Sequence, residues 1–327
     1  MAASATRIRS SALAVTLGDP RGVGPEVARR AAATLLADEP DVPLVFVGPE
    51  ELVRPDASGG AWDVLPVEGW DGTEEGAGRA SGRAIEAAVR LALDGSVAGI
   101  VTAPVHKPSL HRAGWRVPGH TELLKDLAGA ARVGMLMCAE RTPLGGALRV
   151  LLATTHLALR DVPSVFDVPL LVGQASLLHE GLRRDFGLER PRIALCAFNP
   201  HASDDGLCGD EEARISRPAM DLLETRGVTV SRPVPADTVF TRALRGEFDA
   251  VLAPYHDVGM AAFKTASFGS GVNVTLGLPF VRTSPDHGTA FDLAAEPGRA
   301  DPSSMLEAFR LALRMARARF DTDSRDV

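Results

Sequence analysis

Three histidines stand in similar places along the chain, each a few residues after an apolar run that is typical of a β-strand. They are His156 at the end of TTH, His201 at the end of NPH and His256 in the middle of YHD. Ligands of open α/β sheets bind outside the carboxyl ends of the strands. Neutral imidazole is a common ligand of first-row metal ions, and three histidines leave coordination positions open for substrate or water. Together they predict a divalent-metal site, although each alone is more often a hydrogen-bonded loop residue.

The expected ion is Zn, Co or Ni, and Mg is less expected because it prefers oxygen ligands. Asp257 follows His256 and is expected to accept a hydrogen bond from its ring. We count Asp257 as a catalytic candidate together with Lys264, one of three lysines in the sequence. Lys264 is expected to act either as the proton donor or acceptor or as a fixed charge.

A second group of residues has the composition of an anion site. An arginine grips a phosphate or carboxylate with a planar fork, a lysine adds a point charge, and a helix start offers free N–H groups. The alternative is that the arginine is a surface charge and the threonine only caps a helix. The candidates are His120, Thr121, Lys264, Asn273 and Arg282.

Two glycine-containing stretches are cofactor candidates. GDPRGVG follows a predicted strand but lacks the GxGxxG spacing, which favours a tight turn in which Asp19 bonds the backbone. In DHGTAFD, His287 and Gly288 are expected to open a short helical turn, and Asp292 could accept hydrogen bonds from a ribose diol. The alternative is an ordinary loop with Asp292 exposed. The cofactor candidates are His287, Gly288, Thr289 and Asp292.

The periodicity of apolar residues predicts alternating strands and helices, and therefore an α/β fold with a parallel sheet covered by helices. Strands are predicted at 13–17, 44–47, 99–101, 134–138, 148–153, 192–197 and 250–252. Helices are predicted from residue 25, at 81–93, 121–127, 164–184 and 211–225, and from residue 304. Residues 69–82 are rich in Gly and Glu and resemble a linker.

Composition narrows the class of protein. A net charge of −7 over 327 residues, without a basic block, argues against nucleic acid as a partner. No apolar run reaches the roughly 18–20 residues of a membrane span, and the start of the chain has no signal-peptide pattern. Three cysteines without a CxxC pair fit reduced thiols and a cytoplasmic protein. The absence of a GxSxG elbow disfavours acyl transfer.

These motifs give the chain a family resemblance over nearly its whole length. It resembles the 4-hydroxythreonine-4-phosphate dehydrogenase family of vitamin B6 (pyridoxine) biosynthesis through GDPRGVGPE, TAPVHKPSLHRAG, PGHTELL, TTHLALRDV, NPHAS, YHDVGMAAFK and GSGVNVTLGLPFVRTSPDHGTAFDLA, in that order. More distantly, GDPRGVGPEV and DHGTAFDLA resemble the isocitrate and isopropylmalate dehydrogenases, whose two-domain fold this family is known to share.

The resemblance implies a homodimer of two-domain α/β subunits with parallel or mixed sheets. Residues 1–128 and 285–327 would form the cofactor domain, and residues 129–284 the domain that carries metal, substrate and dimer contacts. The active site would lie in the cleft between the domains, near the dimer interface. The three histidines match the family's metal ligands, and the five anion-site candidates match its substrate residues. Asp292 resembles the acidic residue that binds the adenosine ribose in the wider dehydrogenase superfamily, which favours NAD over NADP.

The implied reaction is oxidation of the secondary alcohol of 4-phosphohydroxy-L-threonine, or of a similar 4-phosphorylated hydroxy acid, to a 3-oxo acid that decarboxylates. Two departures bear on the substrate: Leu207 replaces the histidine of a family Gly-Gly-His-x-Gly run, and Val258 replaces the glutamine usual after YHD. Relatives that oxidise 4-phosphorylated threonate or erythronate, or dicarboxylate cis-dihydrodiols, vary in the same loop and are the alternatives. A catalytically silent metal-binding protein is a third hypothesis.

Overall fold

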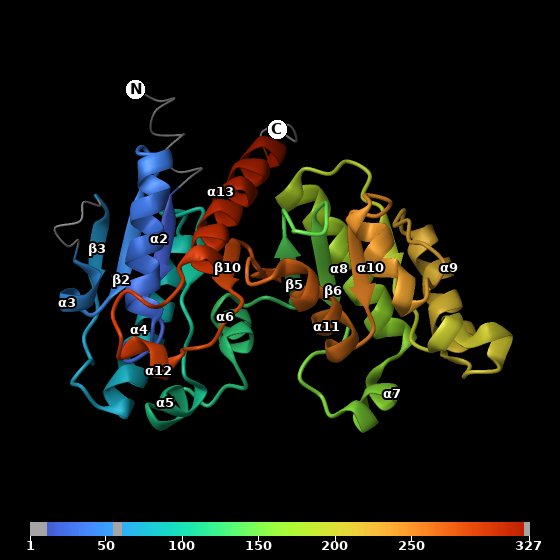
Figure 1. Ribbon diagram of the computed structural model, residues 1–327, viewed down its shortest axis with the longest axis horizontal. Coiled ribbons are helices and arrows are strands. Elements are labelled where there is room, and N and C mark those ends of the chain that lie inside the picture. Colours follow the sequence, from blue (N-terminus) through green and yellow to red (C-terminus); the bar gives the residue numbers. More distant parts are fainter. Residues whose placement is uncertain (1–11, 55–60, 324–327) are drawn as a thin grey trace. The chain divides into compact units, whose positions relative to one another are not determined.

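The computed structural model describes residues 12–54 and 61–323, which divide into two compact units (Figure 1). The first unit comprises residues 1–133 and 278–327, and the second comprises Gly134–Gly277. In both units strands are covered by helices, and the predicted α/β class with parallel and mixed sheets is confirmed. None of the described helices is both long and apolar enough to cross a membrane.

The described strands of the first unit run parallel in the order β3-β2-β1-β4-β10. They are β1 (Leu13–Thr16), β2 (Leu44–Gly48), β3 (Asp63–Pro66), β4 (Gly99–Thr102) and β10 (Val281–Pro285). The described helices are α2 (Gly24–Asp38), α3 (Glu50–Val53), α4 (Glu74–Leu93), α5 (Lys107–Arg112), α6 (His120–Leu127), α12 (Phe291–Ala294) and α13 (Ser303–Asp323).

Helices cover both faces of this parallel sheet. The chain crosses from β1 to β2 in one direction and from β3 to β4 in the other, so right-handed crossovers place α2 and α4 on opposite faces. On one face, α4 packs its Ile85 against Ala14 and Ile100 in a buried cluster. Helices α2 and α13 pack against each other (Figure 1). Because both faces are covered, β1 and β4 are buried at every position.

The described strands of the second unit form a mixed sheet in the order β9-β5-β6-β8-β7, in which β6, β8 and β7 are parallel and β5 is antiparallel to both neighbours. They are β5 (Gly134–Ala139), β6 (Leu148–Leu152), β7 (Ile193–Leu195), β8 (Ala250–Ala253) and β9 (Val272–Leu276). The described helices are α7 (Val162–Val165), α8 (Val168–Phe186), α9 (Arg217–Thr225), α10 (Ala236–Leu244) and α11 (His256–Ser267), with a 3-10 turn at Leu159–Asp161 and a π-helical turn at Glu212–Ser216.

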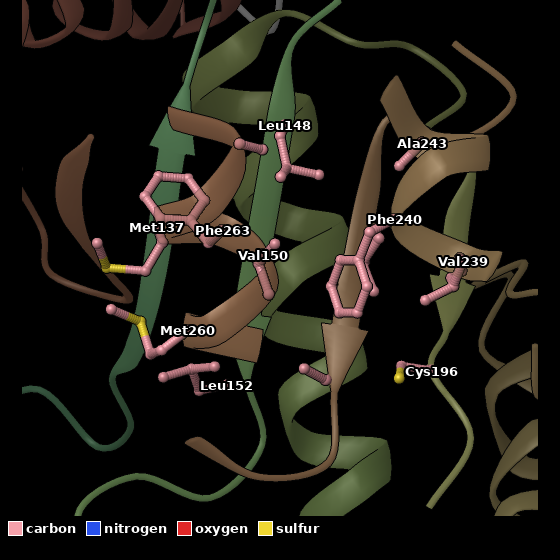
Figure 2. Close-up of a cluster of buried hydrophobic side chains, with 14 of the residues drawn as sticks. Met137, Leu148, Val150, Leu152, Cys196, Val239, Phe240, Ala243, Met260 and Phe263 are labelled. Carbon is pink, nitrogen blue, oxygen red and sulfur yellow. The ribbon is translucent and has the colours of Figure 1, made fainter. Parts of the chain in front are cut away.

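A buried apolar cluster joins α10 and α11 to this sheet (Figure 2). Phe263 of α11 is fully buried, and Phe240 of α10 lies in the same cluster as Leu148 and Val150 of β6. Gly259 allows α11 to approach closely, since a Cβ at this position would lie 2.5 Å from a methyl of Leu152. The start of α11, which carries His256, is therefore fixed against β6.

Most of the glycine-rich stretch expected to be a linker, residues 74–82, belongs to a helix, so the linker prediction was wrong for that part. Helix α4 begins at Glu74, seven residues before the predicted start, because Thr73 Oγ1 accepts a hydrogen bond from the N–H of Gly76 at 2.9 Å. A Cβ on Gly78 would lie 1.9 Å from the carbonyl oxygen of Ser109. The glycines thus serve close packing of α4 against α5.

The other predicted strands and helices are present within a few residues of their expected bounds, except for one helical turn. Helices α3, α5, α10 and α11 and strand β3 were not predicted. The short helical turn expected at His287–Gly288 begins instead at Phe291, after an irregular stretch in which Ala290 has a left-handed φ of 43°. Residues 286–290 are therefore held by contacts with other segments.

Candidate functional site

Two of the three predicted metal ligands lie side by side. Strands β6 and β8 are parallel neighbours, so the loops that follow them leave the same edge of the sheet. Thr154 Oγ1 donates to the carbonyl oxygen of Pro254 at 2.9 Å and ties the two loops together. The rings of His156 and His256 have centroids 5.6 Å apart. This separation suits two imidazoles that share one ion.

His256 has its ring orientation set by a carboxylate. Its Nδ1 lies 2.7 Å from Oδ1 of Asp257, the partner expected from the sequence. A carboxylate that accepts from Nδ1–H leaves Nε2 with its lone pair free for a ligand. The ring is about one-third exposed and Asp257 is largely exposed, so both can be reached from solvent.

His201 follows β7, the next parallel strand, but it does not complete a three-residue cluster. Within residues 12–54 and 61–323 no group of three or more His, Cys, Asp or Glu side chains is arranged to hold a metal ion. His201 is exposed and begins a run of residues with left-handed φ angles that extends to Asp205. Such angles are unfavourable for residues other than glycine, so other contacts must hold this run.

Glu212 supplies those contacts, and sequence reasoning missed it. Its buried carboxylate accepts the backbone N–H groups of Phe198 and Asn199 at 2.8 and 2.9 Å, and the side-chain amide of Asn199 at 2.9 Å. The hydroxyl of Ser203 also donates to it. Burial alone would raise the pKa of Glu212, but these hydrogen bonds outweigh burial and lower the pKa. An isolated glutamate thirteen residues after Asn199 gives no sequence pattern that could have revealed this.

In the first unit, two anion-site candidates lie close together in a poorly solvated place. Arg282 of β10 is 2% exposed, and its Nη2 donates to Thr102 Oγ1 at the end of β4 at 2.8 Å. Burial lowers the pKa of Arg282 to about 10. Burial and, secondly, the charge of Arg282 lower the pKa of His120 well below its usual value. His120 therefore faces a buried cation as a neutral ring.

The His120 ring also has an unused polar atom. Its Nε2 is shielded from solvent and has no hydrogen-bond partner among the described residues. A buried polar atom without a partner is costly, and bound ligands are one way in which such atoms are satisfied. The alternative that Arg282 is a surface charge is wrong, because the residue is buried.

The remaining substrate candidates are placed as follows. Thr121 is half-buried in the first turn of α6. Lys264 is an exposed residue near the end of α11, and Asn273 is half-buried in β9. The side-chain oxygen of Asn273 is shielded and has no hydrogen-bond partner among the described residues. Lys264 and Asn273 belong to the second unit, whereas His120, Thr121 and Arg282 belong to the first.

The predicted cofactor run lies against the GDPRGVG loop of the same unit. The N–H of Val23 donates to the carbonyl oxygen of Thr289 at 2.9 Å, and Gly22 leaves no room for a Cβ beside that carbonyl. His287 Nδ1 lies 2.9 Å from the carbonyl oxygen of Gly288, while its Nε2 is shielded and without a partner in the described chain. Asp292 is exposed.

The GDPRGVG loop is the tight turn that its sequence favoured. Oδ1 of Asp19 accepts the N–H of Arg21 at 3.0 Å, so the aspartate bonds the backbone two residues on. Gly18 has a φ of 68°, and a Cβ there would overlap the carbonyl of Pro104. The loops after β1 and β4 are thus in close contact.

The two sequence departures have different surroundings. Val258 packs against the apolar cluster of the second unit, which accounts for an apolar residue at this position. Leu207 is 85% exposed and follows the left-handed run. The leucine at this position is not explained by any contact in the second unit.

Comparison with known proteins supports the resemblance seen in the motifs. The family model described as pyridoxal phosphate biosynthetic protein PdxA matches residues 26–312. A 4-hydroxythreonine-4-phosphate dehydrogenase of Chromobacterium violaceum is 44% identical, with 93% of this chain and 96% of the relative covered. A crystal structure of the Klebsiella pneumoniae 4-hydroxythreonine-4-phosphate dehydrogenase is 38% identical, with a TM-score of 0.84 over 94% of this chain and 98% of that one. A terephthalate 1,2-cis-dihydrodiol dehydrogenase structure from Burkholderia xenovorans is 26% identical, with a TM-score of 0.65 over 93% and 98% of the chains.

The fold and these relatives define an oxidoreductase of the dehydrogenase class that acts on a CH–OH group, as predicted. The chain belongs to the PdxA family of pyridoxal phosphate biosynthetic proteins.

Replacement of Glu212 by Gln is expected to loosen the run that carries His201. The variant keeps the size of the side chain but removes the charge that accepts four hydrogen bonds, so we expect a loss of about 1–3 kcal/mol in the free energy of unfolding. Amides of residues 198–204 should exchange faster with deuterium. Glu224→Gln, at an exposed position of α9, is the control. Unchanged exchange in Glu212→Gln would show that other contacts hold the run.

His120 is expected to make the protein less stable in mild acid. The unfolded chain binds a proton near the ordinary pKa of 6.5, whereas the folded chain does not until a much lower pH. The free energy of unfolding of the wild type therefore decreases as the pH falls below 6.5. His120→Gln has no imidazole at this position and lacks this decrease. The free energy of unfolding of the wild type, relative to the variant, should fall by about 1 kcal/mol per pH unit below 6.5.

Urea unfolding at about pH 8 and about pH 5.5 measures this difference. His111→Gln, at an exposed histidine, is the control. An equal pH dependence in His120→Gln and the wild type would contradict a lowered pKa for His120.

Proposed function

We propose that the protein oxidises the secondary alcohol of 4-phosphohydroxy-L-threonine, or of a similar 4-phosphorylated hydroxy acid, to a 3-oxo acid that then decarboxylates. The hydride acceptor is NAD, and a divalent metal ion assists. The observation that carries this proposal is the buried Arg282 beside the neutral His120 in a chain of this family. A dehydrogenase for an uncharged alcohol has no use for such a pair.

Phosphate recognition rests on the chemistry of these two residues. A guanidinium that is 2% exposed is poorly solvated, and a bound phosphate restores the lost solvation through short charged hydrogen bonds. We propose that Arg282, His120 and Thr121 bind the phosphate end. Lys264 and Asn273 would bind the rest of the substrate. Holding the non-reacting end fixes which face of the carbinol carbon is presented for hydride transfer.

The pair His156 and His256 fits a divalent ion, because the two rings have centroids 5.6 Å apart and Asp257 orients one of them. We propose that these two residues hold the ion and that His201 is a third ligand. When bound, such an ion lowers the pKa of an alcohol and stabilises negative charge on its oxygen. Lys264 in its neutral amine form would take the hydroxyl proton as the hydride leaves the carbinol carbon.

The cofactor run fits a ligand that brings hydrogen-bond donors. A carbonyl can only accept, so Nδ1 of His287 carries the proton and its unpartnered Nε2 is an acceptor in the neutral ring. The exposed carboxylate of Asp292 is an acceptor as well. A ribose diol supplies donors to such groups, whereas the 2′-phosphate of NADP is itself an acceptor. We therefore propose NAD as the preferred cofactor.

Oxidation of a dicarboxylate cis-dihydrodiol is a second candidate function. It is favoured by the similarity to the terephthalate dihydrodiol dehydrogenase structure, which is 26% identical over 93% of this chain. In that case Arg282 would bind a carboxylate instead of a phosphate.

Formation of NADH with a panel of hydroxy acids tests the activity. We expect turnover with 4-phosphorylated hydroxy acids, little with their unphosphorylated forms or with dihydrodiol dicarboxylates, and a preference for NAD over NADP. Removal of metal by a chelator should abolish turnover, and Zn, Co or Ni should restore it. Full activity after metal removal would exclude the metal role. Turnover of dihydrodiols alone would favour the second function.

Arg282→Lys tests phosphate recognition. Lysine keeps the charge but loses the planar fork, so the KM for the phosphorylated substrate should rise about 10-fold to 100-fold while the KM for NAD stays the same. Inorganic phosphate should compete with substrate in the wild type and compete less in the variant. Arg54→Lys, at an exposed arginine of the same unit, is the control. A wild type that phosphate does not inhibit would argue for a carboxylate ligand.

A further inference from the structure

Phe291 is held between two side chains from two other loops. The guanidinium carbon of Arg21 lies 5.1 Å from the centroid of the Phe291 ring, and the His106 ring meets it edge-on at 5.1 Å with an interplanar angle of 81°. Phe291 is 39% exposed and belongs to a helix of only four residues, which has little stability of its own. The two contacts therefore fix a ring that local structure would leave free.

Arg21 is itself rigidly placed. Its Nε and Nη2 donate to the two oxygens of Asp19 at 3.0 and 2.9 Å, and Asp19 is fully buried. Its Nη2 also donates to Ser109 Oγ at 2.7 Å, and the Ser109 hydroxyl lies 2.7 Å from His106 Nδ1. Ser109 is buried as well. A single hydrogen-bonded network thus orients both side chains that contact Phe291. We call its four residues the Phe291 clamp: Asp19, Arg21, His106 and Ser109.

The Phe291 clamp acts on residues 286–292, which contain one strained residue and two other anchoring contacts. Ala290, next to Phe291, has a φ of 43°, which is unfavourable for a residue with a Cβ. The carbonyl of Thr289 accepts the N–H of Val23, and the N–H of Asp286 donates to Ser304 Oγ at 3.0 Å. The segment is therefore fixed on both sides of the strained residue. Without the Phe291 contact, the next anchor that the described residues provide on the side that carries Asp292 is Gly298, whose N–H donates to Glu26 Oε1 at 3.0 Å.

We propose that Arg21 is a positioning residue for the cofactor, which through Phe291 holds Asp292 in place for the adenosine ribose of NAD. This inference rests on the proposed function. In this role Arg21 does not act on the reacting atoms. It keeps the segment that carries Asp292 ordered before the cofactor binds, so that less conformational entropy is lost on binding. Preorganisation of this kind raises affinity for the cofactor and leaves the chemical step unchanged.

Two variants separate positioning from folding. Arg21→Lys keeps a positive charge near Asp19 but cannot make the two-pronged contact and lie on the ring at the same time. Phe291→Leu keeps an apolar side chain at a partly exposed position and removes the ring, so it should fold even if Arg21→Lys does not. Arg54→Lys, whose exposed side chain pairs with Glu50 of α3, is the matched control.

Deuterium exchange of residues 287–294 in the protein without cofactor, calorimetric binding of NAD, and steady-state kinetics are the measurements. We expect faster exchange in both variants, a Kd for NAD raised about tenfold, and a kcat at saturating NAD within about twofold of the wild type. The KM for the hydroxy acid should not change, and Arg54→Lys should match the wild type.

Unchanged exchange and an unchanged Kd in both variants would overturn the positioning role. A fall in kcat with an unchanged Kd would also overturn it, because Arg21 would then act on the chemical step. A wild type that binds no NAD would overturn the proposed function instead, and the exchange measurement would still decide whether Arg21 holds the segment.

Discussion

The carboxyl ends of parallel strands meet at one edge of a sheet, and this constraint decides where the polar loops of both units gather. In the first unit, β1 and β4 are parallel neighbours, so the GDPRGVG loop and the loop that carries His106 meet through Gly18 and Pro104. In the second unit, β6 and β8 bring His156 and His256 together. Neither pairing requires contact between the two units, because each follows from the strand order within one unit.

The surroundings of the buried polar groups distinguish candidates for ligand binding from groups with a structural role. Arg282 is 2% exposed, and the Nε2 atom of His120 is shielded from solvent without a hydrogen-bond partner among the described residues, which suits a pair that binds an anionic ligand. Glu212 is also buried, at 8% exposed, but its carboxylate accepts hydrogen bonds from Phe198, Asn199 and Ser203, which suits a group with a structural role. The pKa directions follow the same division, since burial is the main cause of the lowered pKa of His120, whereas for Glu212 burial raises the pKa and the hydrogen bonds together outweigh it.

Local strain is concentrated beside the predicted ligand residues. His201, a predicted metal ligand, is the first of the left-handed residues that extend to Asp205. The left-handed Ala290 lies two residues before Asp292. Beside the first, the buried carboxylate of Glu212 accepts hydrogen bonds from Asn199 and Ser203. Beside the second, the buried carboxylate of Asp19 holds Arg21, which contacts the Phe291 ring. Strain of this kind persists only where surrounding contacts over-determine the conformation. Short motifs such as NPHAS and DHGTAFD therefore depend on contacts with other segments for their conformation.

The sequence by itself determined the α/β class, most strands, and the ligand-type residues, because apolar periodicity and the chemistry of His, Arg and Asp are local properties. It did not reveal that the glycines of α4 serve helix packing, since that depends on Ser109 and Trp115 at the facing surface. Nor did it reveal Glu212 or the contact of Arg21 with Phe291, which join residues separated in the chain and follow no spacing rule. The burial of Arg282 was likewise decided by the tertiary structure, because a charged residue in a strand can face solvent or the core, and the packing around β10 alone selects between them.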